Sequence, residues 1–206
     1  MIRPPEPTPA PEPLIPGMPA DLRRWAFEVA RTVLLVAALY LVLSSFVVQP
    51  VEVEMRSMEP LLVEGDRLLV DRLSLRWDTP RRGEIVVFDA PPPYGDDGVP
   101  FVKRVVGLPG ETVQIENGRL YVSGPDAPPS RLDEPYLPAG TLTLPQGTAG
   151  TRIWQVPEGA IFVLGDNRGE SLDSRTFGPV DLGRLVGRVL VRYLPLDRIG
   201  FVATRD

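Results

Sequence analysis

The sequence contains no histidine and no cysteine, and these two absences exclude most familiar hydrolase chemistries. A Ser-His-Asp triad needs an imidazole as its base, and a cysteine peptidase needs a thiol. A zinc site built without either residue would have carboxylates alone, which are poor ligands for that metal. We therefore expect neither a metal nor another cofactor. Disulfides cannot form, so they say nothing about the redox compartment.

Lysine is almost absent as well, because Lys103 is the only lysine among 22 basic residues. Codon bias accounts for the excess of arginine itself. Arginine keeps its proton in proteins, however, whereas a desolvated lysine can lose it. The single lysine is therefore a hint that an amine able to lose its proton is needed at this position. The formal net charge is −5 with both signs intermixed, which argues against nucleic-acid binding.

The N-terminal part of the chain consists of a proline-rich tail and an apolar segment. Residues 1–20 carry eight prolines, which is typical of a disordered tail. Residues 21–49 are predicted to form a transmembrane anchor helix that Asp21 caps and Pro50 ends. The uncharged stretch, residues 32–48, would span only about 25 Å as a helix. The preceding turns can extend it if Arg31 snorkels.

Two other interpretations of this segment are a cleavable signal peptide and a buried core helix. Residues 46–49 are not the small residues of a cleavage site, and little chain is available to cover a core helix. Basic residues precede the segment and acidic residues follow it: Arg23, Arg24 and Arg31, then Glu52 and Glu54. The positive-inside rule then predicts a single-pass protein of the plasma membrane, with a cytoplasmic N-terminus and residues 50–206 on the outer face.

Residues 50–206 are predicted to be mainly β, as coiled antiparallel sheets or a partial barrel with a hairpin lobe at about residues 108–160. Within the lobe, residues 112–123 form a hairpin pattern in which Asn117 and Gly118 suit a type I′ turn. The predicted strands cover residues 51–55, 67–73, 83–88, 101–106, 112–123, 151–156, 161–164 and 186–193.

Two of these segments carry candidate catalytic side chains. Ser57 follows the first strand and precedes Pro60 and a Gly-Asp pair, which indicates a turn. Lys103 lies on a strand where Phe101 and Val105 share its face. Apolar neighbours remove solvent from the ammonium, so we expect the pKa of Lys103 to be lowered. A neutral lysine can accept a proton from a serine hydroxyl.

A third segment, residues 163–179, follows an apolar strand and gathers serine, aspartate, asparagine and arginine. A Ca²⁺ loop is the alternative to a hydrogen-bonded turn here. The acidic residues do not have the spacing of such a loop, and Arg168 and Arg175 would repel a cation. Asp173 and Arg175 are predicted to be structural partners.

Together these segments resemble type I signal peptidases over nearly all of residues 25–200. The family pattern is an anchor, then Ser-Met-x-Pro, then Lys-Arg with Gly-x-Pro-Gly, then Gly-Asp-Asn-Arg-x-x-Ser-x-Asp-Ser-Arg. Residues 57–60, 103–110 and 165–175 match these motifs in order. The resemblance implies the mostly β peptidase fold shared with self-cleaving repressors. It also implies a serine endopeptidase that removes signal peptides from exported preproteins, cleaving after small residues (Ala-x-Ala).

The resemblance also implies individual roles, with Ser57 as nucleophile and Lys103 as general base. Ser171 matches a serine that hydrogen-bonds to the lysine and orients it. The other supporting residues are Met58, Arg104, Gly165, Asp173 and Arg175.

Met55 departs from the family pattern, because family members often have Gly or Ser there. Where that residue is Ser, its hydroxyl helps to form the oxyanion hole. We therefore expect the oxyanion to rely on the N–H of Ser57 and on a neighbour or water. Residues 61–62 read Leu-Leu where the family usually has Thr-Leu, which affects packing more than chemistry.

The short link between the apolar segment and Ser57 fits this role. It reaches only about 30 Å when fully extended, so the nucleophile stays close to the lipid bilayer. Two alternatives remain open: a Ser-Lys processing peptidase with a specialised substrate, and a catalytically inactive membrane-anchored β module that binds partners. A self-cleaving repressor would need a DNA-binding module at its N-terminus, whereas residues 1–49 here read as a proline-rich tail and an apolar segment.

Overall fold

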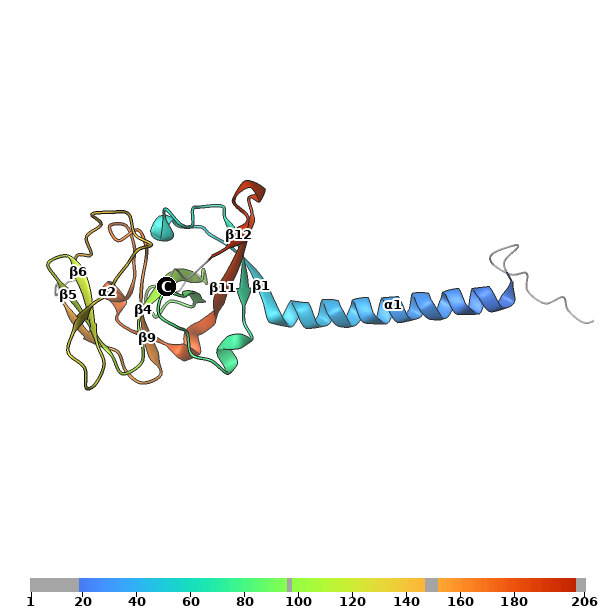
Figure 1. Cartoon of the computed structure of the whole chain (residues 1–206), viewed down its shortest axis with the longest axis horizontal. Helices are drawn as coiled ribbons and strands as arrows, with labels where there is room; N and C mark the ends of the chain where they lie inside the picture. The colour runs from blue at the N-terminus through green and yellow to red at the C-terminus, as the bar shows by residue number, and fades with distance from the viewer. Residues whose placement is uncertain (1–18, 96–97, 147–151, 203–206) are drawn as a thin grey trace, which may run out of the picture. The chain divides into compact units, whose positions relative to one another are not determined.

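The computed structural model describes residues 19–95, 98–146 and 152–202, which fall into two units, Met1–Ser44 and Ser45–Asp206. The proline-rich tail predicted for residues 1–20 lies almost entirely outside the described residues. Most of the described part of the first unit is helix α1 (Ala20–Val47), drawn in blue in Figure 1.

Helix α1 begins at Ala20, so Asp21 lies in its first turn and does not cap it. A carboxylate in the first turn still favours the helix dipole. Nine large apolar side chains in the described part of α1 are at least 60% exposed: Trp25, Phe27, Val33, Leu34, Leu35, Val36, Leu39, Tyr40 and Leu41. Among the residues that the structure describes, no helix is long and apolar enough to cross a membrane. The transmembrane anchor at residues 21–49 stays a prediction.

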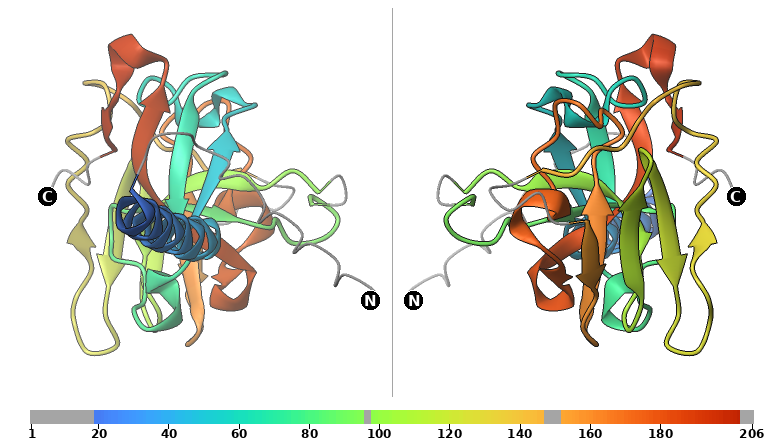
Figure 2. Two further views of the ribbon diagram at one scale, coloured as in Figure 1. Left: turned by 90° about the vertical axis from the view of Figure 1, so that its right-hand side faces the viewer. Right: turned by 90° about the vertical axis from the view of Figure 1, so that its left-hand side faces the viewer.

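The second unit is mainly β, which confirms the predicted fold class. Its larger sheet has eight strands in the order β1-β2-β11-β3-β4-β9-β10, and β12 pairs with β11. All pairs are antiparallel, and shifts of register along β11 and β4 help the sheet to curl. Figure 2 shows the strands from two opposite sides. The strands are β1 (Val48–Glu52), β2 (Arg67–Asp71), β3 (Ile85–Phe88), β4 (Phe101–Gly107), β9 (Ala160–Leu164), β10 (Val180–Asp181), β11 (Leu185–Leu194) and β12 (Gly200–Phe201).

The smaller sheet has four strands in the order β7-β6-β5-β8. They are β5 (Thr112–Glu116), β6 (Arg119–Ser123), β7 (Ser130–Arg131) and β8 (Ile153–Gln155). Asn117 and Gly118 join β5 to β6 with φ angles of 50° and 73°, which confirms the predicted hairpin with two left-handed residues. The boundaries 108–160 for an inserted lobe stay a prediction.

Strand β4 lies in the middle of the larger sheet, between β3 and β9, and all seven of its residues are buried. Phe101 and Val105 share one apolar cluster, whereas Val102 and Val106 belong to two others. This separation is the alternation expected of a strand with both faces covered. A lysine on such a strand is necessarily removed from water.

Short helices connect the strands: η1 (Arg56–Met58), η2 (Ser74–Arg76), α2 (Ser174–Phe177), η3 (Leu182–Arg184) and η4 (Leu196–Arg198). The strand predicted for residues 51–55 is wrong at its end, because β1 stops at Glu52. Val53 still exchanges hydrogen bonds with Gly65 and Asp66, but the chain then turns into η1. This turn places Ser57 on a helix instead of a sheet edge.

Candidate active site

Ser57 lies in the middle of helix η1 and is 7% exposed. Its main chain is held by the turn that follows β9. The N–H of Asn167 donates to the carbonyl of Ser57 (3.0 Å), and Nδ2 of Asn167 donates to the carbonyl of Arg56 (3.2 Å). The nucleophile candidate is therefore fixed by residues more than 100 positions away in the sequence.

Lys103 brings its amine directly to Ser57. It lies on β4 and is fully buried, which confirms the expectation of a desolvated lysine. Nζ of Lys103 donates to Oγ of Ser57 (2.7 Å) and to the carbonyl of Val102 (3.1 Å). The ring of Phe101, on the same face of the strand, lies 5.0 Å from Nζ. The arrangement can pass a proton from the hydroxyl to the amine, because a neutral amine accepts through the same contact.

Burial controls the charge of this amine. It lowers the pKa of Lys103 from 10.5 to about 8, and the nearby carboxylate of Asp173 opposes the shift by favouring the ammonium. At neutral pH a substantial minority of the molecules then carry a neutral lysine. A lysine in water would be neutral in well under 1% of molecules at that pH.

Asp173 and Arg175 form a buried ion pair, which confirms their predicted partnership. Nε and NH2 of Arg175 each donate to the Asp173 carboxylate at 2.8 Å, and both side chains are fully buried. Asp173 also accepts from the N–H of Gly165 (3.1 Å) and caps helix α2. One carboxylate thus joins the two ends of the polar segment.

Ser171 is buried close to Ser57, but it does not make the contact that the resemblance implies. Among the described residues, Oγ of Ser171 has no hydrogen-bond partner, so it does not orient Lys103 in this structure. Gly165 lies between the two serines. A Cβ added to Gly165 would come within 2.2 Å of Oγ of Ser171 and 2.4 Å of the carbonyl oxygen of Ser57.

Arg104, the neighbour of Lys103, binds Asp166, which was not predicted from the sequence as a residue of the site. Its Nε and NH2 donate to both oxygens of Asp166 at 2.8 and 2.7 Å, and both side chains are about 1% exposed. The pair ties β4 to the same turn that holds Ser57. The neighbouring Asn167 was also missed as a residue of the site. The Gly-Asp-Asn-Arg motif contained both residues, but their partners depend on how distant strands pair.

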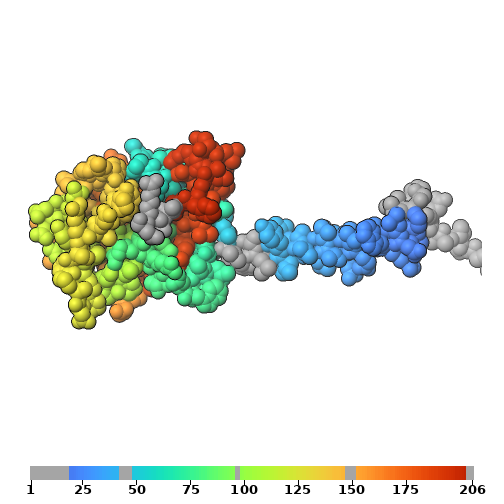
Figure 3. All heavy atoms as spheres, in the orientation of Figure 1, coloured from blue at the N-terminus to red at the C-terminus, as the bar shows by residue number. Residues whose placement is uncertain are grey.

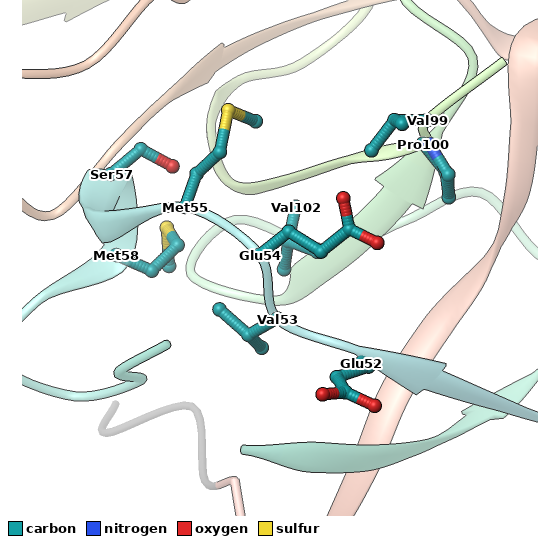
Figure 4. A pocket seen from close by; sticks show the side chains of 9 residues that line it. All are labelled: Glu52, Val53, Glu54, Met55, Ser57, Met58, Val99, Pro100 and Val102. Carbon is teal, nitrogen blue, oxygen red and sulfur yellow. The ribbon is translucent and has the colours of Figure 1, made fainter. Parts of the chain in front are cut away.

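A small pocket opens beside Ser57 (Figure 4). One side is the chain that leads into η1, with Met55 and Met58, and the other is the chain around the start of β4, with Pro100 and Val102. Met58 is buried in the core, whereas Met55 is 39% exposed at the pocket. The pocket has a volume of about 10 Å³ on a scale where one water needs roughly 10–15 Å³. The pocket therefore has little room for a large side chain.

Acidic side chains of the described residues do not gather into a metal site: no group of three or more is placed to hold an ion. The groups that the structure brings together at the site are a buried serine and amine, with carboxylate–arginine pairs around them. This set suits acyl transfer through a serine nucleophile.

Comparisons with known proteins agree with this chemistry. The family model of "Signal peptidase, peptidase S26" matches residues 26–194. Signal peptidase I of Bacillus caldolyticus is 41% identical over 190 residues, covering 87% of this chain and 94% of that protein. A probable signal peptidase I-1 of Synechocystis is 37% identical, covering 85% and 87%, and signal peptidase IB of Staphylococcus aureus is 33% identical, covering 89% and 95%.

Among solved structures, a crystal structure of a signal peptidase I from Enterococcus faecalis V583 is 33% identical to this chain. It has a TM-score of 0.41, and the match covers 54% of this chain and 97% of that one.

Proposed function

Since the chain belongs to the signal peptidase family, peptidase S26, and is a serine endopeptidase of signal peptides, we propose that Ser57 is its nucleophile and Lys103 its general base. The observation that carries this proposal is the 2.7 Å contact between Nζ of Lys103 and Oγ of Ser57 in a buried site. No other lysine, and no histidine or cysteine, exists in the chain to supply a base or a different nucleophile.

The reaction follows from this geometry. Neutral Lys103 takes the proton of Ser57 while Oγ attacks the scissile carbonyl carbon and forms a tetrahedral intermediate. The resulting ammonium then gives its proton to the leaving amine, and the acyl-enzyme remains. Lys103, neutral again, takes a proton from water, whose oxygen attacks the acyl carbon and forms a second tetrahedral intermediate. The bond between this carbon and Oγ of Ser57 then breaks, Lys103 returns its proton to Oγ, and the signal peptide leaves.

The surrounding residues have positioning roles in this proposal. Asp173 and Arg175 hold the polar segment, Arg104 holds Asp166, and Gly165 lets the segment approach Ser57. Oγ of Ser171 has no hydrogen-bond partner among the described residues, so its orienting role stays a prediction. Met55 offers no hydroxyl to an oxyanion, and the donors for that charge stay a prediction as well.

The pocket beside Ser57 supports cleavage after small residues. A volume of about 10 Å³ disfavours large side chains at this position. Val53, Met58 and Val102 contribute an apolar wall. The substrate is then a preprotein with a small residue at the cleavage site.

Lipid is the second partner that we propose. The apolar side chains of α1 between residues 33 and 41 are exposed, which is costly in water and favourable against lipid. The single pass, the cytoplasmic N-terminus and the outer-face position of residues 50–206 stay predictions from charge and hydropathy.

Cleavage of a preprotein by the purified full-length chain in detergent tests the proposal. Wild type should release a mature protein whose N-terminus follows an Ala-x-Ala site, and Ser57→Ala should not. Inactive wild type would favour the alternative of a non-catalytic binding module. The cleaving activity should also remain with membranes after alkaline carbonate extraction, and its release would contradict the lipid contact.

The pH dependence of cleavage should follow the charge of Lys103. Only the neutral amine acts as a base, so kcat/KM should rise with pH and reach half its plateau near pH 8, the pKa of Lys103. Below that pH the rate should fall about tenfold per unit, because the ammonium fraction approaches one. A rate independent of pH between 6 and 9 would contradict a lysine base with this pKa.

A further inference from the structure

Residues 132–146, which follow β7 and precede β8, contact the turn that holds Ser57. Figure 3 shows these yellow to orange residues on the surface of the β unit. On one side, the N–H groups of Leu132 and Thr143 donate to carbonyls of the β5–β6 hairpin, at Leu120 (2.9 Å) and Gly118 (3.0 Å). The segment is therefore fastened to the smaller sheet at two points.

On its other side, the same segment binds the turn after β9, residues 165–168, through Glu134. We call residues 165–168 the catalytic turn. The carboxylate of Glu134 pairs with the guanidinium of Arg168, and the phenol of Tyr136 donates to it (2.8 Å). Thr143 supplies a second acceptor to Arg168 through its hydroxyl. The side chain of Arg168 is about 1% exposed, and that of Glu134 is 12% exposed. Charge-assisted bonds at such burial are strong and fix geometry.

Arg168 also stabilises the part of the chain that contacts Ser57. Its Nε donates to the carbonyl of Gly165 (3.0 Å), while the N–H of Asn167 donates to the carbonyl of Ser57 (3.0 Å). A parallel contact runs through Tyr136, whose ring lies 4.0 Å from the guanidinium carbon of Arg104. Glu134 is thus connected to the main chain of Ser57 in two steps: it binds Arg168, and the preceding residue, Asn167, donates to Ser57.

We propose that Glu134 is a positioning residue for catalysis, which holds Arg168 and, through it, the turn that sets the main chain of Ser57. The inference rests on the proposed function of Ser57. It gives the smaller lobe a role in the chemistry, although the lobe contributes no residue to the pocket beside Ser57. Glu134 contacts neither Ser57 nor Lys103 directly.

Glu134→Gln tests the inference, with Glu111→Gln as a matched control. Glu111 makes a comparable partly buried pair with Arg82 (2.6 Å) and accepts from the N–H of Leu108 (2.7 Å), away from the catalytic turn. We expect Glu134→Gln to lower kcat about 10- to 100-fold with KM changed less than about 3-fold, since small displacements of reacting groups have effects of this size. Glu111→Gln should keep kcat within about 2-fold of wild type.

A second measurement does not depend on activity. Lys103 is the only lysine, so lysine labelled with ¹³C at Cε gives a single side-chain NMR signal from the full chain in detergent. Loss of one negative charge, acting through space, would lower the pKa of Lys103. A displaced Ser57 would instead let water reach the amine of Lys103, which would raise the pKa of Lys103. We expect the midpoint to rise in Glu134→Gln and to stay unchanged in Glu111→Gln.

The outcomes separate the two proposals. A Glu134→Gln enzyme that matches Glu111→Gln in kcat and in the Lys103 midpoint overturns the positioning role and leaves the Ser57–Lys103 dyad standing. Inactive wild type overturns the dyad, and the NMR midpoint still decides the positioning role. If Glu134→Gln does not fold, Tyr136→Phe decides: it keeps the ring and removes the bond to Glu134. A 3- to 10-fold loss of kcat supports the role, and an unchanged kcat overturns it.

Discussion

Lys103→Arg is expected to abolish signal peptide cleavage, with kcat at least about 10³-fold lower than wild type at every pH from 6 to 10. Arginine keeps a positive charge over this whole range and cannot accept the proton of Ser57. The chain has no histidine and no other lysine that could replace Lys103 as the base. Single-turnover cleavage of a preprotein measures the effect without interference from product release.

Lys103→Met separates lost chemistry from lost folding. Methionine fills about the same apolar space along β4 and removes the buried amine, whose desolvation works against the charged form. We expect Lys103→Met to melt at the same temperature as wild type or higher, and to be as inactive as Lys103→Arg. Cleavage retained by either variant within about tenfold of wild type would eliminate Lys103 as the base.

The proposed pairing of Ser57 with Lys103 came from the family resemblance, and the strand pattern around Lys103 supported it. Lys103 sits on a run of β-branched and aromatic residues, and such a run forms a buried strand wherever it pairs. Phe101 on the same face then removes water from the amine, as its 5.0 Å contact with Nζ shows. The composition contributed as well, since the sequence has a single lysine and no histidine.

The residues that hold the pair were not predictable in the same way. Arg104 meets Asp166 only because β4 pairs with β9, and Asn167 meets Ser57 only because the turn after β9 folds over η1. These contacts join positions 62 and 110 residues apart, and no local periodicity encodes them. Glu134 and Tyr136 lie in a proline- and glycine-rich stretch, where neither helical nor strand spacing gives a pattern.

The prediction for Ser171 illustrates a different limit. Family motifs identify which side chains gather at a site, and Ser171 is indeed buried beside Gly165. They do not specify the rotamer, which depends on what each neighbour offers at contact distance. A hydroxyl with no partner among the described residues is the kind of group that turns toward a ligand or toward Lys103 during the reaction.

Gly165→Ala is expected to have the other large effect, through a single methyl group. A Cβ at this position would lie 2.4 Å from the carbonyl oxygen of Ser57 and 2.2 Å from Oγ of Ser171. The carbonyl belongs to the backbone and already accepts from the N–H of Asn167, so it can move only together with η1. We expect kcat to fall about 10²-fold or more, because the nucleophile shifts relative to Lys103. Overpacking should also lower the free energy of unfolding by about 1–3 kcal/mol.

Gly169→Ala in the same turn is the matched control, and its expected effect on stability has the opposite sign. A Cβ on Gly169 meets no atom within 4 Å, and this glycine has an ordinary φ. Alanine there restricts the unfolded chain, so the free energy of unfolding should stay equal or rise by up to about 1 kcal/mol. Thermal melting and kcat measured on both variants distinguish a steric effect at Ser57 from general sensitivity of the turn. Equal behaviour of the two alanine variants would show that close packing at Gly165 does not set the position of Ser57.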